Sequence, residues 1–518
     1  MRSKKFRIVL TGGFLTLLAV VAFRKGSAAS GQVVSQQVKN HAIANVEHST
    51  PVAEAAAFGE EASGAELLQY TDKPATAAKV ERLMAAATKE VHYAKIDREL
   101  LGGSNSPLAK EGGRVSFTLP DGRSVPVLIQ KAQNLGAERY VSEGTIEGEG
   151  FGRAVFAYNQ GELSAVIDDI SHGSWQIRAM GDSVAQVFEV DHGLVPPCGA
   201  SPEKHAAHSH SEAPEARSVM TAAAQEIGSG PSPVAGMGIP GGWAEALGWP
   251  LLGSIEWSTQ VRVLVPYSSV ILTVLPEWAV VTWIDVAIAS MNSDLARSGL
   301  PVKVVLAGAV PVQYNQEWQG SDDTALDDAL VRVANSADGI MDEIHVMRAD
   351  VQADLVCFAM CQHDSNNSGI GYILKYPGDG FNSTWAFSAV DFWYMNSSSV
   401  FSHELGHNFG CNHDRENART TTGVQMTGSH SYSYGYRFYG EDGQQYRTIM
   451  SYSPGRALPY YSNPYITAPY PINVPIGAHM GTWDEAYNAM TILQNTNEVS
   501  NYSLTRAVVR TAKRLRGW

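Results

Sequence analysis

The amino-acid sequence predicts two folded domains: a mainly antiparallel β domain, followed by an α/β (α+β) domain with a mixed sheet. Three observations lead to this prediction. Short segments of alternating hydrophobic and polar residues, separated by turn signals, fill residues 111–192. Strand-like and helix-like patterns alternate after residue 255. Between the two regions, residues 193–250 are rich in Pro, Gly, Ala and Ser, which is typical of a linker.

The composition is that of a globular chain that buries a large core. Of 518 residues, 44% are hydrophobic and 17% are charged, which excludes a wholly disordered, collagen-like or coiled-coil protein. The net charge of −14 argues against a nucleic-acid partner. Only 4 cysteines are present, so the fold is not a disulfide scaffold and each cysteine needs its own explanation.

The N-terminus has the pattern of a signal peptide. Its first seven residues (MRSKKFR) are basic, residues 8–23 are apolar, and residues 27–29 are small, so we expect residues 1–29 to be cleaved off. The apolar run is short for a bilayer span, although the basic pair Arg24 and Lys25 leaves an uncleaved anchor as the alternative. We therefore expect a secreted protein, extracellular or periplasmic in a Gram-negative bacterium, with no stable membrane span after cleavage.

The elements of the first domain follow from its local patterns. Residues 50–110 are rich in Ala, Glu and Lys with spaced leucines, which predicts helix and polar connecting chain. Strands are expected at 115–119, 125–129, 152–159 and 184–190, with hairpin-type turn signals at 120–122 and 159–161. The linker that follows contains His205, His208 and His210, which we interpret as solvated side chains rather than metal ligands.

The second domain is predicted to alternate strands and helices. Strands are expected at 261–265, 302–306, 354–359 and 369–374. Helical spacing of apolar residues predicts helices at 278–297, 326–333 and 486–493.

The residues that can carry chemistry are concentrated in one segment, 401–414 (FSHELGHNFGCNHD). On a helix, His403 and His407 lie one turn apart on the same face, and Glu404 lies beside them without being a ligand. Gly410 can adopt the left-handed conformation that ends a helix, so that the chain turns and His413 returns as a third ligand. Three neutral imidazoles and an open fourth position describe a catalytic zinc site. Such a metal activates water and polarises a carbonyl while Glu404 takes the proton, which results in hydrolysis of an amide bond.

The spacing H-E-x-x-H-x-x-G-x-x-H resembles the metzincin zinc metalloproteases, and Asp414 directly after the third histidine is what their reprolysin (adamalysin-like) branch shows. Residues 446–452 (YRTIMSY) resemble the Met-turn of this family, in which Met450 would lie beneath the zinc ligands as an apolar floor. Further similarity to bacterial reprolysin-like peptidases, including peptidyl-Asp metalloendopeptidases, is found at 292–299, 327–345, 353–356 and 460–464. The resemblance covers about 255–503 and implies one catalytic Zn²⁺, whereas no motif supports a calcium site.

The resemblance implies roles for two more residues. Tyr452 stands where astacin-like and serralysin-like metzincins have a tyrosine that can stabilise the oxyanion, the alternative being a packed aromatic. Cys198, between Pro197 and Gly199, resembles the cysteine switch of metzincin propeptides, whose thiolate occupies the open position of zinc. The family has Arg where Pro197 stands, and an unpaired linker cysteine is the alternative.

The other three cysteines leave two pairings open. Cys411 lies inside the zinc motif, and a disulfide to Cys361 or Cys357 would clamp the active-site helix to the upstream segment. A bridge between Cys357 and Cys361 is the competing possibility, and the sequence does not choose between them.

Together these expectations describe a secreted zymogen. Residues 1–29 are the signal peptide, 30–245 an inhibitory β-rich propeptide, 251–505 a metzincin-like catalytic domain with an active-site helix, and 506–518 a basic tail. Protein or peptide substrates would lie extended along an edge strand, for which 369–374 is the candidate. The rival hypotheses are a non-catalytic adhesion or binding module that keeps zinc for stability, and a protease limited to self-processing. Cleavage specificity, including any preference for Asp, cannot be read from the sequence.

Overall fold

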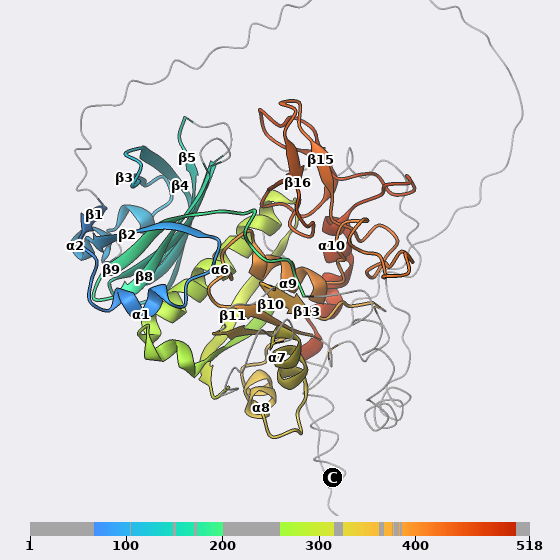
Figure 1. Ribbon diagram of the computed structural model, residues 1–518, viewed down its shortest axis with the longest axis horizontal. Helices are drawn as coiled ribbons and strands as arrows, with labels where there is room; N and C mark the ends of the chain where they lie inside the picture. The colour runs from blue at the N-terminus through green and yellow to red at the C-terminus, as the bar shows by residue number, and fades with distance from the viewer. Residues whose placement is uncertain are drawn as a thin grey trace, which may run out of the picture. The chain divides into compact units, whose positions relative to one another are not determined.

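The computed structural model describes residues 67–199 and 259–503, apart from gaps at 104, 149–151, 170–172, 315–324, 362–366, 376, 378–382 and 384–385. The predicted signal peptide, the start of the predicted propeptide, the linker histidines and the basic tail therefore lie outside the described residues. We call residues 67–199 the N-terminal module and residues 259–503 the C-terminal module (Figure 1). Both modules belong to one unit of the fold, Ser63–Trp518.

A nine-stranded antiparallel sheet forms most of the N-terminal module. Its spatial order is β1-β2-β9-β8-β7-β6-β5-β4-β3, so strands β3 to β9 make a continuous meander. The strands are β1 (Leu68–Thr71), β2 (Thr88–Ile96), β3 (Arg114–Thr118), β4 (Ser124–Gly136), β5 (Arg139–Ile146), β6 (Gly152–Asn159), β7 (Glu162–Asp169), β8 (Gly173–Gly181) and β9 (Val184–Val190). Only short helices accompany them: α1 (Ala77–Glu81), α2 (Arg98–Leu101) and the 3₁₀ turn η1 (Pro107–Ala109).

Both hairpin signals of the sequence are confirmed. Gln160 and Gly161 have φ angles of 50° and 92°, and they join β6 to β7 so that Asn159 pairs with Glu162. Two left-handed residues in a two-residue loop match the twist of the flanking strands, which is why this turn favours Gly. The turn at 120–122 joins β3 to β4 through a longer loop, in which Thr118 pairs with Ser124 and Gly122 alone has a positive φ, of 85°.

The expectation of helix and polar chain across residues 50–110 is wrong at two described segments, Leu68–Thr71 and Thr88–Ile96, which are strands. Residues Thr88–Ile96 form the nine-residue strand β2, which pairs with β1 on one side and β9 on the other. The helices α1 and α2 have only five and four residues. Pairing with β9, far away in sequence, outweighs the helical propensity of Ala, Glu and Lys. The β-rich region therefore begins at Leu68 and not at residue 111.

A five-stranded mixed sheet forms the centre of the C-terminal module. Its spatial order is β11-β10-β12-β14-β13, with β13 antiparallel to β14 and the other neighbours parallel. The strands are β10 (Thr259–Ser268), β11 (Val302–Val312), β12 (Leu355–Met360), β13 (Gly369–Gly371) and β14 (Phe387–Asp391). The mixed sheet agrees with the sequence prediction, and the predicted edge strand at 369–374 is the shorter β13, which does lie at an edge.

The helices of the C-terminal module surround this sheet and the segments that follow it. They are α6 (Glu277–Arg297), α7 (Ala325–Ala334), α8 (Glu343–Asp350), α9 (Val400–Asn408), α10 (Asn488–Val499) and the 3₁₀ turn η2 (Ser269–Thr273). Two small sheets lie between α9 and α10 in the chain. They contain β15 (Arg437–Tyr439), β16 (Gln445–Arg447) and β17 (Arg456–Ala457), and β18 (Asn463–Thr467) and β19 (Pro475–Ile476).

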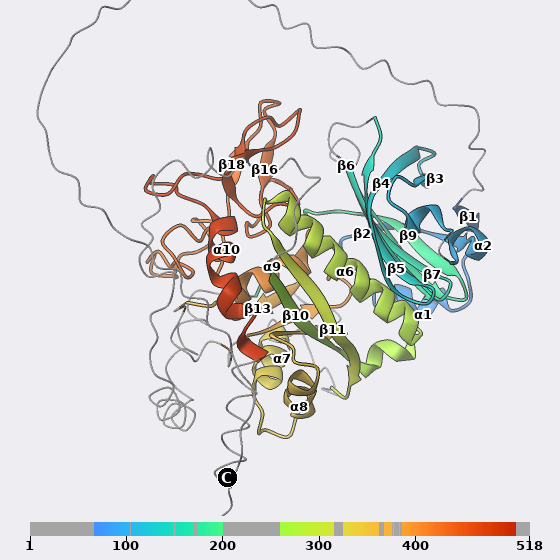
Figure 2. The same ribbon diagram turned by 180° about the vertical axis from the view of Figure 1, so that it is seen from behind.

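Helix α6 lies between the two main sheets, against β6 and β7 of one and β11 of the other (Figure 2). Trp283, Ile284 and Met291 belong to a large apolar core that also contains Tyr93 and Phe188 of the N-terminal module. Val286 packs against Ala157 and Val166 of the N-terminal module. Among the described residues, no helix has the length and apolarity needed to cross a membrane.

Candidate metal centre

Helix α9 presents His403 and His407 on one face and then ends in a tight turn. The N–H of Cys411 donates to the carbonyl of Gly406 at 3.0 Å, and the N–H of Gly410 donates to the carbonyl of His407 at 2.8 Å. Gly410 has a φ of 96°, and a Cβ placed there would lie 1.9 Å from Oγ of Ser429. Only glycine satisfies both conditions, and the turn returns the chain to the helix face, as the sequence predicts.

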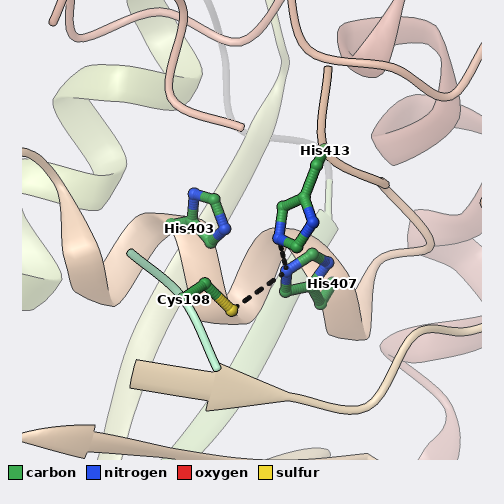
Figure 3. A group of neighbouring side chains, drawn as sticks. All are labelled: Cys198, His403, His407 and His413. Atoms are coloured by element: carbon green, nitrogen blue, oxygen red, sulfur yellow. Dashed lines mark hydrogen bonds between the residues drawn. The ribbon is translucent and has the colours of Figure 1, made fainter. Parts of the chain in front are cut away.

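Four side chains meet at this face. The potential ligand atoms of Cys198, His403, His407 and His413 all lie within 4.8 Å of one another (Figure 3). Nε2 of His407 is 3.0 Å from Nε2 of His413 and 3.6 Å from Sγ of Cys198. All four residues are buried.

The donor chemistry of this cluster fits a zinc ion. Nδ1 of His403 lies 2.8 Å from the carbonyl of Ile449, and Nδ1 of His407 lies 2.9 Å from that of Cys411. An imidazole that donates from Nδ1 keeps a lone pair on Nε2. Nε2 of His403 is buried without a hydrogen-bond partner among the described residues. Burial also lowers the pKa of His403 to about 4 and that of His407 well below its ordinary value, so both rings are neutral, as a metal requires.

Glu404 points into the same site without joining the cluster of ligand atoms. It is 1% exposed, and the thiol of Cys198 donates to its Oε2 at 3.3 Å. Burial raises the pKa of the Glu404 carboxyl well above its ordinary value. Strand β13 passes so close that a Cβ on Gly369 would lie 2.6 Å from Cγ and Oε1 of Glu404. The sequence did not single out Gly369.

Met450 packs against helix α9 at Gly406 and is fully buried. A Cβ on Gly406 would be 2.6 Å from Sδ of Met450, so the glycine inside the histidine motif permits the close approach of this thioether. The carbonyl that holds Nδ1 of His403 belongs to Ile449, the residue before Met450. The position agrees with the apolar floor expected from the resemblance.

Tyr452 reaches the cluster from the segment that follows Met450. Its hydroxyl donates to the carbonyl of Cys198 at 2.8 Å and lies 3.1 Å from Nε2 of His413. Its backbone N–H donates to Oδ2 of Asp414 at 3.0 Å. Asp414, which in the sequence marks only a family likeness, also forms an ion pair with Arg437 at 3.2 Å. Asp414 therefore ties the third histidine to the segment that carries Tyr452.

Cys198 enters the site as part of an extended segment that pairs with strand β13. A parallel bridge joins Cys198 to Gly369, and the N–H of Gly199 donates to the carbonyl of Gly369 at 2.8 Å. The N–H of Ser368 donates to the carbonyl of Pro197 at 3.1 Å. The end of the N-terminal module thus occupies the edge of the mixed sheet beside Glu404.

The predicted disulfide is absent. All four cysteines lie among the described residues, and none is in a disulfide. Cys357 is fully buried in strand β12 and Cys361 follows the end of that strand, so four residues of extended chain, about 13 Å, separate them. Such a distance exceeds the span of a disulfide. The thiol of Cys411 instead points to the carbonyl of Asn488 at 3.7 Å.

A cavity of about 330 Å³ adjoins the cluster, and one cation on its wall was not assigned from the sequence. His403, Glu404 and Arg447 all line it. The Arg447 side chain is 7% exposed and donates to the carbonyls of Ser451 at 2.7 Å and Gly455 at 3.0 Å. No carboxylate among the described residues forms an ion pair with it. Burial lowers the pKa of Arg447 to about 10, so it remains charged near neutral pH.

Comparison with known proteins agrees with the motif. Residues 270–462 match the family model Reprolysin_5, described as metallo-peptidase family M12. The C-terminal module therefore contains a reprolysin-like metzincin domain, and the resemblance inferred from the sequence is confirmed.

Three curated relatives carry the name "Peptidyl-Asp metalloendopeptidase". Two come from Stenotrophomonas maltophilia (strains R551-3 and K279a), each 29% identical over 187 residues, covering 36% of this chain and 40% of the relative. The third, from Pseudomonas aeruginosa, is 29% identical over 150 residues and covers 26% of this chain and 24% of the relative. The chain thus spans at most about 40% of the length of these relatives. A solved chain titled "Structure of a chaperone-substrate complex" aligns at 19% identity with a TM-score of 0.35, over 48% of this chain and 39% of that one.

Proposed function

We propose that the protein is a zinc-dependent endopeptidase that is made as a secreted, inactive precursor. The observation that carries the proposal is the convergence of three imidazoles beside the buried carboxyl of Glu404. Two of them, His403 and His407, are neutral, and Nε2 of His403 has no hydrogen-bond partner among the described residues. The M12 family match over residues 270–462 supports the reaction class. The apolar and small residues within 1–29 support export.

In this proposal His403, His407 and His413 hold the zinc through their Nε2 atoms. Zinc, when bound, lowers the pKa of a water molecule and polarises the carbonyl of the bond to be cleaved. Glu404 accepts the proton of the attacking water at a carboxylate oxygen and passes it to the leaving amine. The raised pKa of its buried carboxyl suits a group that must both take and return a proton.

Tyr452 has the role of a hydrogen-bond donor to the carbonyl oxygen under attack. Its hydroxyl already donates to a peptide carbonyl, that of Cys198, at 2.8 Å. A donor fixed at the point where an oxygen gains negative charge stabilises the transition state more than the substrate. The backbone bond from Tyr452 to Asp414 keeps this hydroxyl in position.

Latency rests on the segment around Cys198. Its thiol lies 3.6 Å from Nε2 of His407 and donates to Glu404. It would therefore occupy a ligand position of the zinc and also block the carboxylate that accepts the proton. The same segment pairs with β13, the edge along which an extended substrate would bind. Removal of the N-terminal module would free the metal, the base and the edge together.

Cleavage next to acidic residues is the specificity that we propose. The relatives are named for peptidyl-Asp cleavage. Arg447 supplies a buried positive charge on the wall of the cavity that also borders His403 and Glu404. Arg447 forms no ion pair among the described residues, and Asp414 offsets only part of the cost of burying its charge. The carboxylate of a substrate would compensate the remaining cost.

The decisive experiment compares the wild-type chain with Glu404→Gln, which keeps the shape of the side chain but cannot accept a proton. Both are incubated with an unfolded protein after removal of the N-terminal module, with and without a zinc chelator. We expect digestion by the wild type to stop with chelator and to fall at least a hundredfold in the variant. Equal digestion by both chains would exclude the mechanism. Cleavage of its own precursor without digestion of added protein would favour self-processing, and zinc binding without any cleavage would favour the binding module.

A further inference from the structure

The mixed sheet of the C-terminal module has two edges, and they differ in what covers them. At one edge, β13 is paired with the segment of Cys198 and Gly199, so an extended piece of chain already adds to this sheet. At the other edge, β11 pairs with β10 alone (Figure 2). Beyond Val304, the outward backbone groups of β11 have no hydrogen-bond partner among the described residues. An unpaired strand edge is a template for another extended chain.

At Val304 a side chain of helix α6 takes the place of a neighbouring strand. Nδ2 of Asn292 donates to the carbonyl of Val304 at 2.9 Å, and the N–H of Val304 donates to Oδ1 of Asn292 at 2.8 Å. A peptide group of an adjacent strand would form the same kind of bonds. The register with β10 has no shift between residues 304 and 306, so the backbone groups of Leu306 point the same way as those of Val304. The pair at Leu306 is therefore available to a peptide.

The exposure of β11 is unusual for a long strand of this chain. All eight residues of β6, for example, are buried between the apolar core of their own sheet and helix α6. In β11, by contrast, residues 305–310 are only half-buried, and none of them has a polar side chain. Lys303 and Pro311 flank this stretch, and a charge or a proline at an edge limits how far another strand can pair with it. Pairing is therefore confined to a short apolar segment.

A cavity of about 340 Å³ lies beside this edge, and we call it the β11 groove. Its walls come from β11, from helix α6 and from the end of the β4–β5 hairpin. Its apolar lining includes Leu135, Val281, Ile288 and Leu306. Leu135 is 39% exposed, so this wall is open to solvent. The volume is in the range of ligand sites, which are mostly apolar with a few polar groups.

One cation lines the β11 groove without a carboxylate partner. Nζ of Lys303 donates to the neutral amide oxygen of Gln133 at 2.8 Å, and it forms no ion pair among the described residues. The other cation of the groove, Arg139, already holds Asp285 with N–O distances of 2.8 and 2.7 Å. Burial lowers the pKa of Lys303, which reflects the cost of its uncompensated charge. An acidic side chain on a bound segment would supply the missing counter-charge.

We propose that the β11 groove is a second binding site for polypeptide, at the edge of the sheet opposite β13. An extended segment of an unfolded protein adds to β11 as a further strand, bonds to the outward groups from Leu306 onwards, and places a carboxylate on Lys303. The unpaired edge, Lys303 and the α6 wall all belong to the C-terminal module, so they remain when the N-terminal module is removed.

This site holds one part of a long substrate while another part reaches the metal centre. Four inter-strand spacings of about 4.8 Å, about 19 Å in all, separate β11 from β13. Only this use in cleavage rests on the proposed function. Binding at β11 needs neither metal nor hydrolysis, so it can be found even if the chain cleaves nothing.

The test uses the full chain with Glu404→Gln, so that no probe is cleaved. In this uncut chain Cys198 and Gly199 occupy β13, which leaves β11 as the accessible edge. The probe is a fluorescently labelled eight-residue peptide of alternating Val and Thr with one central Asp, and fluorescence anisotropy gives its dissociation constant. Two further probes carry N-methyl groups on the odd or on the even amides.

An added strand uses only one of its two edges, so we expect one methylated probe to lose binding and the other to keep it. Equal binding of the two methylated probes, or equal loss, would overturn the proposal. This comparison uses an unaltered β11 and does not depend on the folding of any groove variant.

Substitutions then locate the site. Lys303→Gln should raise the dissociation constant of the Asp probe about fivefold and leave that of an Asn probe unchanged. Lys95→Gln, at an exposed lysine of β2 outside the groove, is the matched control. Ala289→Phe should abolish binding of both probes because its ring fills the groove, whereas Ala349→Phe on α8 should not.

Two results would assign the groove differently. If Lys303→Gln binds the Asp probe as Lys95→Gln does, or Ala289→Phe binds as Ala349→Phe does, the probe lies elsewhere and the proposal fails. If the chain without peptide is a dimer by light scattering and Ala289→Phe makes it monomeric, the edge belongs to a second copy, which would also overturn the proposal.

Discussion

At the scale of single residues, glycines determine how closely the backbone approaches the metal centre. Gly406 and Gly410 belong to the histidine motif, and the sequence identified the turn at Gly410 from that motif. Gly369 lies on another element, β13, and no local pattern marks it, although a Cβ there would collide with Glu404. The sequence therefore predicted which side chains converge, but it could not predict which backbone must pass beside them.

Gly369→Ala should lower proteolytic activity at least tenfold while the chain still folds. The added Cβ, 2.6 Å from Cγ and Oε1 of Glu404, must displace the carboxyl, and small displacements of a catalytic group are costly. Gly308→Ala is the control, because its Cβ would meet only Cδ1 of Leu264 at 3.5 Å. Peptide hydrolysis and the unfolding temperature are measured for both; similar hydrolysis by the two variants would contradict the expectation.

Arg447→Met should reduce the preference for an acidic residue at the cleavage site at least tenfold. The substitution keeps the aliphatic length but removes the buried charge that borders the cavity. The measurement is the ratio of kcat/KM for two peptides that differ only in Asp or Asn. Arg437→Met is the comparison, since Arg437 pairs with Asp414 and is not among the residues that line the cavity. If Arg447→Met leaves the Asp-to-Asn ratio of kcat/KM unchanged, Arg447 does not determine the cleavage specificity.

At the scale of elements, the helices and strands predicted from the sequence were most accurate where apolar residues recur at a regular period. The prediction of a helix at 278–297 differs from α6 by one residue, and the strands at 152–159 and 184–190 coincide with β6 and β9. Strand β2 was missed because its stability comes from β9, and composition carries no information on such a distant partner. Neither pairing left open for the expected disulfide is formed. Cys357 and Cys361 are close in sequence but lie along extended chain, and the thiol of Cys411 points to the carbonyl of Asn488.

The start of helix α9 is held by the N-terminal module in an unusual backbone conformation. Ser398 and Ser399 have φ angles of 50° and 57°, and Nδ1 of His192 lies 2.6 Å from Oγ of Ser398. Burial, the largest cause, lowers the pKa of His192 to about 4, although Asp168 and Asp191 raise it. Arg447 and Arg456 add to the lowering. The contact between His192 and Ser398 therefore favours the neutral imidazole.

The chain with both modules joined should lose stability in mild acid through His192. Because the folded-state pKa is below the ordinary value of 6.5, the stabilisation is present above about pH 6.5 and is lost as the pH falls towards 4. His192→Gln cannot take up the proton, so its unfolding temperature should fall less over this range. Thermal unfolding of the two chains from pH 7 to pH 4 tests this, and parallel curves would contradict it.

At the scale of the whole molecule, the chain combines two sheets with one helix between them. The sequence predicted the two regions and the order of their fold classes. The sequence could not predict that α6 packs against both sheets. The α6 residues that face the first sheet, such as Asp285 and Asp294, have the composition of an ordinary solvent-exposed helix face. The match to the M12 family model covers residues 270–462 of the C-terminal module and does not extend to the first sheet.

Cys198→Ser should make the uncut precursor at least tenfold more active on a small peptide. A hydroxyl is a much weaker zinc ligand than a thiolate, so the metal and Glu404 would become available while the sheet stays docked. Hydrolysis by intact precursor is measured before any processing occurs. Cys361→Ser serves as control because Cys361 is not in the metal-binding group. A Cys198→Ser precursor as silent as the wild type would show that Cys198 does not control latency.

The double burial of β6 has a consequence for isotope exchange. Amide hydrogens exchange with solvent only when their surroundings open, so a strand covered on both faces is among the slowest regions of the joined protein. If the N-terminal module departs, one face of β6 becomes wet, whereas β10 stays covered by α6 and by the strands beside it. Deuterium uptake in residues 152–159, compared with residues 259–268, would then report in real time when the N-terminal module leaves the C-terminal module.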